Sequence, residues 1–168
     1  MKTSKFSGKL ALEHLVKQVD LGIRAPGTPG HEAVLDLYSQ VLITLGLDVH
    51  RQRWAVPLSK VPSGQVMLTN LLCRIPGGDG PTTLVSSHYD SRWIADNEPD
   101  PEQVDRPIPG ANDGGSGTAV MLELARCLAA RPPAGDVILG FMDGEDLGHI
   151  DDHPFAVGSR ELVAEPGE

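Results

Sequence analysis

Cysteine is scarce in this sequence, and its scarcity excludes two classes of small cross-linked protein. Only Cys73 and Cys127 occur, and they are too far apart in the chain for a C-x-x-C motif. A disulfide framework or a zinc knuckle needs several closely spaced cysteines. Cys73 lies in an apolar run and Cys127 in a helical pattern, so we expect both to be buried free thiols.

Long apolar runs and a surplus of basic charge are also absent. No apolar run approaches the roughly 20 residues of a transmembrane helix, and the first six residues lack the apolar segment of a signal peptide. Lysine and arginine number 14 against 23 aspartates and glutamates, which gives a net charge of −9. This balance argues against nucleic acid or an anionic membrane as a partner. We therefore expect a cytoplasmic protein whose oligomeric state stays open.

The length and composition are those of one globular domain. The chain has 168 residues, of which 40% are hydrophobic, enough for a sizeable core. It contains no internal repeat and no low-complexity tract. We therefore treat residues 1–168 as a single domain.

Hydrophobic periodicity predicts the order helix, helix, three strands, helix, strand, helix. We expect helices at 9–21, 29–45, 116–130 and 156–164, and strands at 47–56, 66–75, 82–87 and 136–142. The first helix rests on apolar positions at Leu12, Leu15, Val16 and Val19, and the strand at 82–87 is expected to be short and buried. Two early antiparallel strands followed by a β-α-β unit predict an α/β sandwich with a central mixed sheet.

Three short acidic motifs stand at the ends of predicted strands or in a glycine-rich turn. They are His88, Tyr89 and Asp90; then Asn112, Asp113 and Gly114; then Asp143, Gly144, Glu145 and Asp146. Because α/β folds build their sites at the carboxyl ends of strands, we expect these side chains to meet. Imidazole nitrogen and carboxylate oxygen are common ligands of zinc.

The first two motifs each allow a structural alternative. Asp90 can accept the second imidazole N–H of His88 and hold the ring for a metal; alternatively, His88 is an ordinary polar residue at a strand end. The glycines around Asp113 permit the sharp turn that a metal-bridging carboxylate needs. Alternatively, Asp113 is the capping residue of the following helix.

The third motif places two acids side by side after a buried strand. One of Glu145 and Asp146 can bind a metal while the other takes a proton from water; the alternative is a solvated turn. Three such motifs at successive strand ends favour a metal site over three unrelated turns.

The sequence resembles the zinc aminopeptidase family that also contains the glutaminyl cyclases. The matching segments lie at 24–30 (R-x-P-G-T-P-G), 88–91, 110–117 (G-A-N-D-G-G-S-G), 122–126, 143–146 and 158–160, in the family's order. The resemblance implies a zinc-aminopeptidase-like α/β fold, a three-layer sandwich, with one or two zinc ions and a peptide substrate.

The same resemblance implies roles for five residues. His88 would bind the first zinc with Asp90 as its hydrogen-bonding partner, and Asp113 would bridge two zinc ions. Glu145 would be the general base. Asp146 would bind the second zinc, at a position where most relatives carry glutamate.

Two branches of the family, and a third possibility, remain open. The opening segment 24–30 and the insertion 147–157 resemble the cyclases, whereas the loop 112–117 has the peptidase form. We favour an aminopeptidase that hydrolyses the amino-terminal peptide bond, over a glutaminyl-peptide cyclotransferase. The third possibility is a truncated relative that is inactive or only binds peptides.

The family needs a further aspartate and a late histidine that the 168 residues do not supply. We therefore expect the sequence to be the amino-terminal portion of a catalytic domain that is truncated at its carboxyl end. His149 and His153 are candidate substitutes for the missing ligands. Trp93 is a candidate wall of the specificity pocket, and no other substrate-binding residue is predicted.

Overall fold

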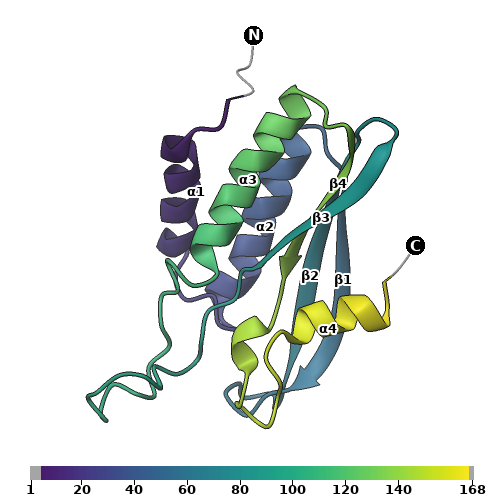
Figure 1. The fold of residues 1–168 in the computed structure, drawn as a ribbon. Helices are drawn as coiled ribbons and strands as arrows, with labels where there is room; N and C mark the ends of the chain where they lie inside the picture. Colours follow the sequence, from purple (N-terminus) through teal and green to yellow (C-terminus); the bar gives the residue numbers. More distant parts are fainter. Residues whose placement is uncertain (1–4, 167–168) are drawn as a thin grey trace.

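A computed structural model describes residues 5–166 and confirms the predicted order of elements (Figure 1). The elements are α1 (Gly8–Asp20), α2 (Pro29–Thr44), β1 (Val49–Pro57), β2 (Gln65–Ile75), β3 (Gly80–His88), α3 (Gly115–Ala130), β4 (Gly135–Met142), the short 3-10 helix η1 (Glu145–Leu147) and α4 (Val157–Ala164). Residues 1–4, where we expected no signal peptide, lie outside the described part. None of the described helices is long and apolar enough to span a membrane.

The four described strands form one mixed sheet in the order β1-β2-β4-β3. β1 and β2 are antiparallel, β2 and β4 are antiparallel, and β3 and β4 are parallel. Parallel neighbours need a crossover connection, and α3 provides it. In the β3–β4 register His88 pairs with Met142, so both strands end at the same level. The segments that follow them therefore begin side by side.

The helices complete three layers around the sheet (Figure 1). α2 and α3 cover one face, α1 packs against α3, and α4 lies across the other face. The larger core cluster joins α2 and α3 to alternate residues of the central strands, among them Leu71, Cys73, Val137, Leu139 and Phe141. A second cluster on the opposite face, around Leu68 and Leu147, supports η1. The predicted three-layer fold with a mixed central sheet is confirmed.

One expectation about burial is wrong, and the first helix buries residues other than its apolar ones. β3 is an edge strand rather than a buried one, and Leu84 is 53% exposed. In α1, Leu12 and Val16 are 58% and 50% exposed, because the helix turns Ala11 and Gln18 toward α3 instead. The Gln18 side chain is held there by buried hydrogen bonds, so a polar network outweighs the apolar stripe of the helix.

Other local expectations are confirmed. Thr28 caps α2 by accepting a hydrogen bond from the His31 amide, with Pro29 in the first turn. Cys73 and Cys127 are buried free thiols. The polar segment 91–109 is a long loop that projects from the body of the fold (Figure 1).

Candidate metal centre

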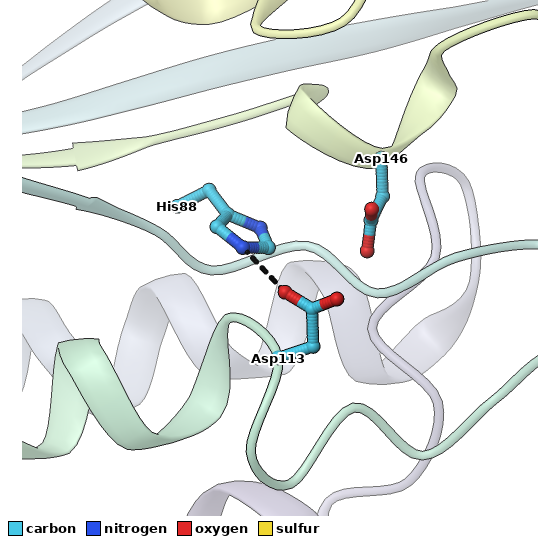
Figure 2. Close-up of side chains that lie close together, drawn as sticks. All are labelled: His88, Asp113 and Asp146. Carbon is cyan, nitrogen blue, oxygen red and sulfur yellow. Dashed lines mark hydrogen bonds and ion pairs between the residues drawn. The ribbon is translucent and has the colours of Figure 1, made fainter.

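Three predicted ligands converge at the end of the parallel strand pair. His88 is the last residue of β3, Asp113 ends the loop before α3, and Asp146 lies in η1 just after β4. One ligand atom from each lies within 4.8 Å of the other two (Figure 2). β3 and β4 are parallel, so their carboxyl ends lie at the same edge of the sheet, and α3 begins at this edge as well. The three side chains therefore lie close together there.

The His88 ring lies between two carboxylates. Its Nε2 is 2.9 Å from Asp113 Oδ1, and its Nδ1 is 3.4 Å from Asp90 Oδ1. Burial lowers the pKa of His88, but the hydrogen bond and charge of Asp90, with the charges of Asp146 and Glu145, outweigh burial and raise the pKa to about 9. The metal-free ring is thus an imidazolium at neutral pH, and a cation at Nε2 would replace its proton.

Asp90 connects the two strand ends. Its carboxylate is fully buried, and besides His88 it accepts hydrogen bonds from the backbone amides of Glu145 at 3.1 Å and Asp146 at 2.9 Å. The carboxylate therefore fixes the histidine ring and the acidic turn relative to one another. This is the arrangement in which a carboxylate orients a metal-binding histidine.

Asp146 offers an oxygen that suits a cation. The residue is 7% exposed, and in the described part of the chain its buried Oδ2 has no hydrogen-bond partner. Burial, with the charges of Asp90 and Asp113, raises the pKa of Asp146 to about 7. An orphaned buried oxygen beside an imidazole and a second carboxylate fits zinc, whose catalytic sites have three protein ligands and an open position.

Two of the three structural alternatives for these motifs do not hold. Asp113 does not cap α3, because the cap is Gly114 and no side chain bonds to the first turn. Gly114 has φ +75°, and a Cβ there would lie 2.6 Å from the Asp90 carbonyl oxygen and 3.1 Å from the His88 ring, so only glycine permits this approach. The acidic turn is not solvated either, since Asp143 is fully buried.

Glu145 lies beside this group but is less buried than its neighbours. Its amide is bound by Asp90, and its carbonyl accepts a hydrogen bond from the Ala156 amide at 3.3 Å. Its charge contributes to the raised pKa values of His88 and Asp146. The structure thus brings together the five residues that the sequence singled out.

Sequence reasoning assigned no role to Arg24, although it opens the segment 24–30. The side chain is fully buried, and its guanidinium donates to the carbonyls of Tyr89 at 2.9 Å, Pro109 at 3.0 Å and Gly110 at 2.6 Å. It ties the segment after His88 to the segment before Asp113. Arginine is almost never fully buried unless it is paired, so the sequence gives no reason to expect a buried side chain at this position.

Asp143 also had no assigned role. Its buried carboxylate accepts hydrogen bonds from Tyr89 Oη at 2.7 Å and the Thr69 amide at 2.7 Å, and His31 Nε2 lies 2.9 Å away. These contacts anchor the residue with which the acidic turn begins. The position of Asp143 in the third motif was the available signal, but its partners are distant in sequence.

A cavity of about 320 Å³ adjoins the ligand group. Its walls include Ile94, Ile108, Asp96 and Glu98, and it reaches Asp113. Trp93 packs against the second core cluster and donates to the Pro26 carbonyl at 3.1 Å, so it is a tucked residue and not a wall of this cavity.

The two loop histidines lie apart from the ligand group. His153 Nε2 is 2.7 Å from the Pro57 carbonyl, and the exposed His149 ring packs edge-on against Phe155. Among the described residues, the only group of ligand atoms close enough for a metal is that of His88, Asp113 and Asp146. The histidines therefore do not substitute for further ligands.

We expect the metal-free protein to become less stable as the pH rises, and zinc to reverse this trend. The folded-state pKa of His88 is about 9 against an ordinary 6.5, and that of Asp146 about 7 against 3.8. Stability therefore falls as the pH rises from about 3.8 to about 7, where Asp146 ionises in the unfolded chain before it does so in the fold, and from about 6.5 to about 9, where His88 loses its proton in the unfolded chain first. Zinc binds the deprotonated ligands, so its affinity rises over the same range.

Urea midpoints measured across this pH range, with a chelator and with zinc, check the expectation. The Asp146→Asn variant is the control, because it removes the contribution of one of the two groups. A metal-free stability that increases between neutral pH and pH 9 would contradict the placement of His88 between two carboxylates.

Known proteins are similar to this chain in sequence and in fold. A family model described as peptidase family M28 matches residues 70–167. A protein named probable zinc metalloprotease from Pyrenophora tritici-repentis is 38% identical over 92 residues, which are 54% of this chain and 18% of that protein.

Two solved structures extend the likeness over nearly the whole chain. A Zn-dependent exopeptidase from Parabacteroides distasonis has a TM-score of 0.88 and 27% identity, and the match covers 98% of this chain and 57% of that one. A glutaminyl cyclase from Tannerella forsythia has a TM-score of 0.84 and 28% identity, covering 93% and 55%. The chain thus spans little more than half the length of these solved relatives.

Proposed function

The chain belongs to peptidase family M28, and from this premise we propose that it takes part in zinc-dependent hydrolysis of the amino-terminal peptide bond of peptides. The observation that carries the proposal is the convergence of His88, Asp113 and Asp146, with Glu145 adjacent to the last of them. The relatives named as zinc metalloprotease and Zn-dependent exopeptidase support zinc as the metal.

In this proposal, His88, Asp113 and Asp146 hold at least one zinc ion. Zinc bound there would act as a Lewis acid toward the substrate carbonyl and lower the pKa of a coordinated water from 15.7 to about 7. Asp90 keeps the His88 ring in the orientation that leaves Nε2 free for the metal, because it accepts the hydrogen bond from the Nδ1–H group.

Glu145 is the proposed general base. It takes a proton from the water that attacks the first peptide carbonyl, and it returns this proton to the nitrogen of the leaving amine as the C–N bond breaks. The hydrogen bond from its own amide to Asp90 fixes its backbone beside the ligand group. The cavity next to Asp113 is the proposed place for the side chain of the amino-terminal residue.

Glutaminyl cyclisation is the second candidate function. The likeness to the Tannerella forsythia glutaminyl cyclase, at a TM-score of 0.84, favours it. In that reaction the substrate's own α-amine attacks the side-chain carbonyl of an amino-terminal glutamine, and ammonia leaves. Glu145 would then pass the proton from the amine to the departing ammonia.

One peptide with an amino-terminal glutamine separates the two reactions. We expect the zinc-loaded protein to release free glutamine and a peptide shorter by one residue, detected by mass spectrometry. Loss of ammonia without shortening would replace the first candidate by the second. If neither product forms, the proposal fails and the chain is at most a peptide-binding relative. The same peptide with an acetylated amino terminus is the control, because both reactions need a free α-amine.

A further inference from the structure

Arg92 links the long loop to the acidic turn, although neither the sequence nor the proposed reaction assigns it a role. The side chain is 9% exposed, and its guanidinium divides its donors between two partners. Nη1 donates to the backbone carbonyls of Asp146 at 2.8 Å and Gly148 at 3.1 Å. Nε and Nη2 donate to the two carboxylate oxygens of Asp96 at 3.0 and 2.6 Å.

The turn that carries Asp146 has little structure of its own to hold it. η1 has three residues, and it lies between Gly144, in the left-handed region, and Gly148. The amide of Asp146 is bound by Asp90, and its carbonyl is bound by Arg92. Both peptide groups that flank the Asp146 side chain are thus fixed by residues outside the turn, in addition to the packing of Leu147 in the second core cluster.

We propose that Arg92, held by Asp96, is a positioning residue that fixes η1 so that the Asp146 carboxylate meets His88 and Asp113 in metal-binding geometry. The inference rests on the proposed function, because it takes Asp146 as a zinc ligand. Arg92 and Asp96 also line the cavity beside Asp113, so the same ion pair connects the shape of that cavity to the ligand group.

The charge of Arg92 and its positioning role would change the affinity for zinc in opposite directions, which makes the proposal testable. Its guanidinium is close enough for the charges of Asp146 and Glu145 to contribute to its raised pKa. By charge alone this cation opposes the binding of a second cation, so removing it would strengthen zinc binding. If Arg92 positions the Asp146 carboxylate, removing it would weaken zinc binding. The sign of the change in affinity therefore distinguishes the two.

Zinc dissociation constants, measured by competition with a chromophoric chelator, provide the test. We expect Arg92→Gln to weaken binding about 10- to 100-fold, the range found when partners that orient metal ligands are lost. Arg92→Lys keeps the charge but lacks the planar fork, so we expect it to recover only part of the affinity. Arg106→Gln is the matched control, because it removes an equal charge from an exposed site in the same loop.

Asp96→Asn is a second, milder variant, because it keeps Arg92 and its bonds to η1 but removes the carboxylate that orients the guanidinium. We expect a smaller loss of zinc affinity in the same direction. Asp96 is a surface residue with 42% of its side chain exposed, so this variant tests the proposal even if Arg92→Gln fails to fold. Affinity that is unchanged or tighter in both variants would overturn the proposal.

Hydrogen exchange in the metal-free protein separates this inference from the proposed function. We expect the amides of Glu145 and Asp146 to exchange faster in Arg92→Gln than in wild type, with other amides unchanged. A wild-type protein that binds no zinc would refute the metal site of the proposed function. Unchanged exchange at these two amides would refute the positioning role of Arg92, whatever the wild type binds.

Discussion

Replacing Glu145 by glutamine is expected to lower turnover by about 10²- to 10⁴-fold, the usual contribution of a general base. Glutamine has nearly the same shape but cannot accept the proton of the attacking water. The backbone contacts that fix this residue, to Asp90 and Ala156, do not involve its side chain and remain. Zinc content and thermal stability are therefore expected to stay close to wild type.

Steady-state kinetics on the zinc-loaded protein, with elemental analysis of the same samples, measure this effect. Glu102→Gln is the matched control, because it makes the same chemical change at an exposed loop position. If Glu145→Gln loses zinc together with activity, Glu145 is a ligand and the base must be sought elsewhere. If the variant keeps full activity, Glu145 is not the base.

Replacing Asp113 by asparagine is expected to remove zinc. The change deletes the anionic oxygen that lies 2.9 Å from His88 Nε2, and it leaves two charged or imidazole ligands instead of three. Losing a residue that orients a metal ligand weakens binding by about 10- to 100-fold, and we expect the loss of a ligand itself to weaken it more. The Asp113 side chain is 61% exposed and makes no helix cap, so the metal-free fold should lose only the small contribution of its exposed ion pair with His88.

Zinc per chain and the metal-free urea midpoint together test this expectation. Asp79→Asn, at an exposed position between β2 and β3, is the control for the change in net charge. A variant that binds zinc as the wild type does would remove Asp113 from the ligand set. A variant that unfolds would show that Asp113 supports the loop before α3, a role that its present contacts do not indicate.

The grouping of His88, Asp113 and Asp146 could be predicted from sequence because its signals are local. His88, Asp113 and Asp146 each lie at the end of an element whose pattern is strong, and a β-α-β unit brings such ends to one edge of a sheet. The period of an apolar pattern also gives the type of an element, and every predicted bound lies within two residues of the observed one. These features depend on short stretches of chain.

What could not be predicted depends on contacts between distant segments. Arg24 and Arg92 are charged residues, which are usually solvated, and nothing near them in sequence indicates that backbone carbonyls will surround them. Likewise, the apolar residues Leu84 and Leu12 mark a strand and a helix correctly. Their pattern does not say whether another element covers them, and in this fold none of the described elements does so fully.

The buried guanidinium of Arg24 also constrains the order in which parts of the protein can fold during synthesis. Its acceptor at Gly110 follows it by 86 residues, which at about 5–20 residues per second corresponds to roughly 4–17 s of translation. Until those carbonyls exist, burying the cation would cost several kcal/mol, so it stays in water. We therefore expect the two amino-terminal helices to pack over the sheet only after the segment 88–110 has been made. The predicted ligands His88, Asp113 and Asp146 can meet only after η1 has also been made.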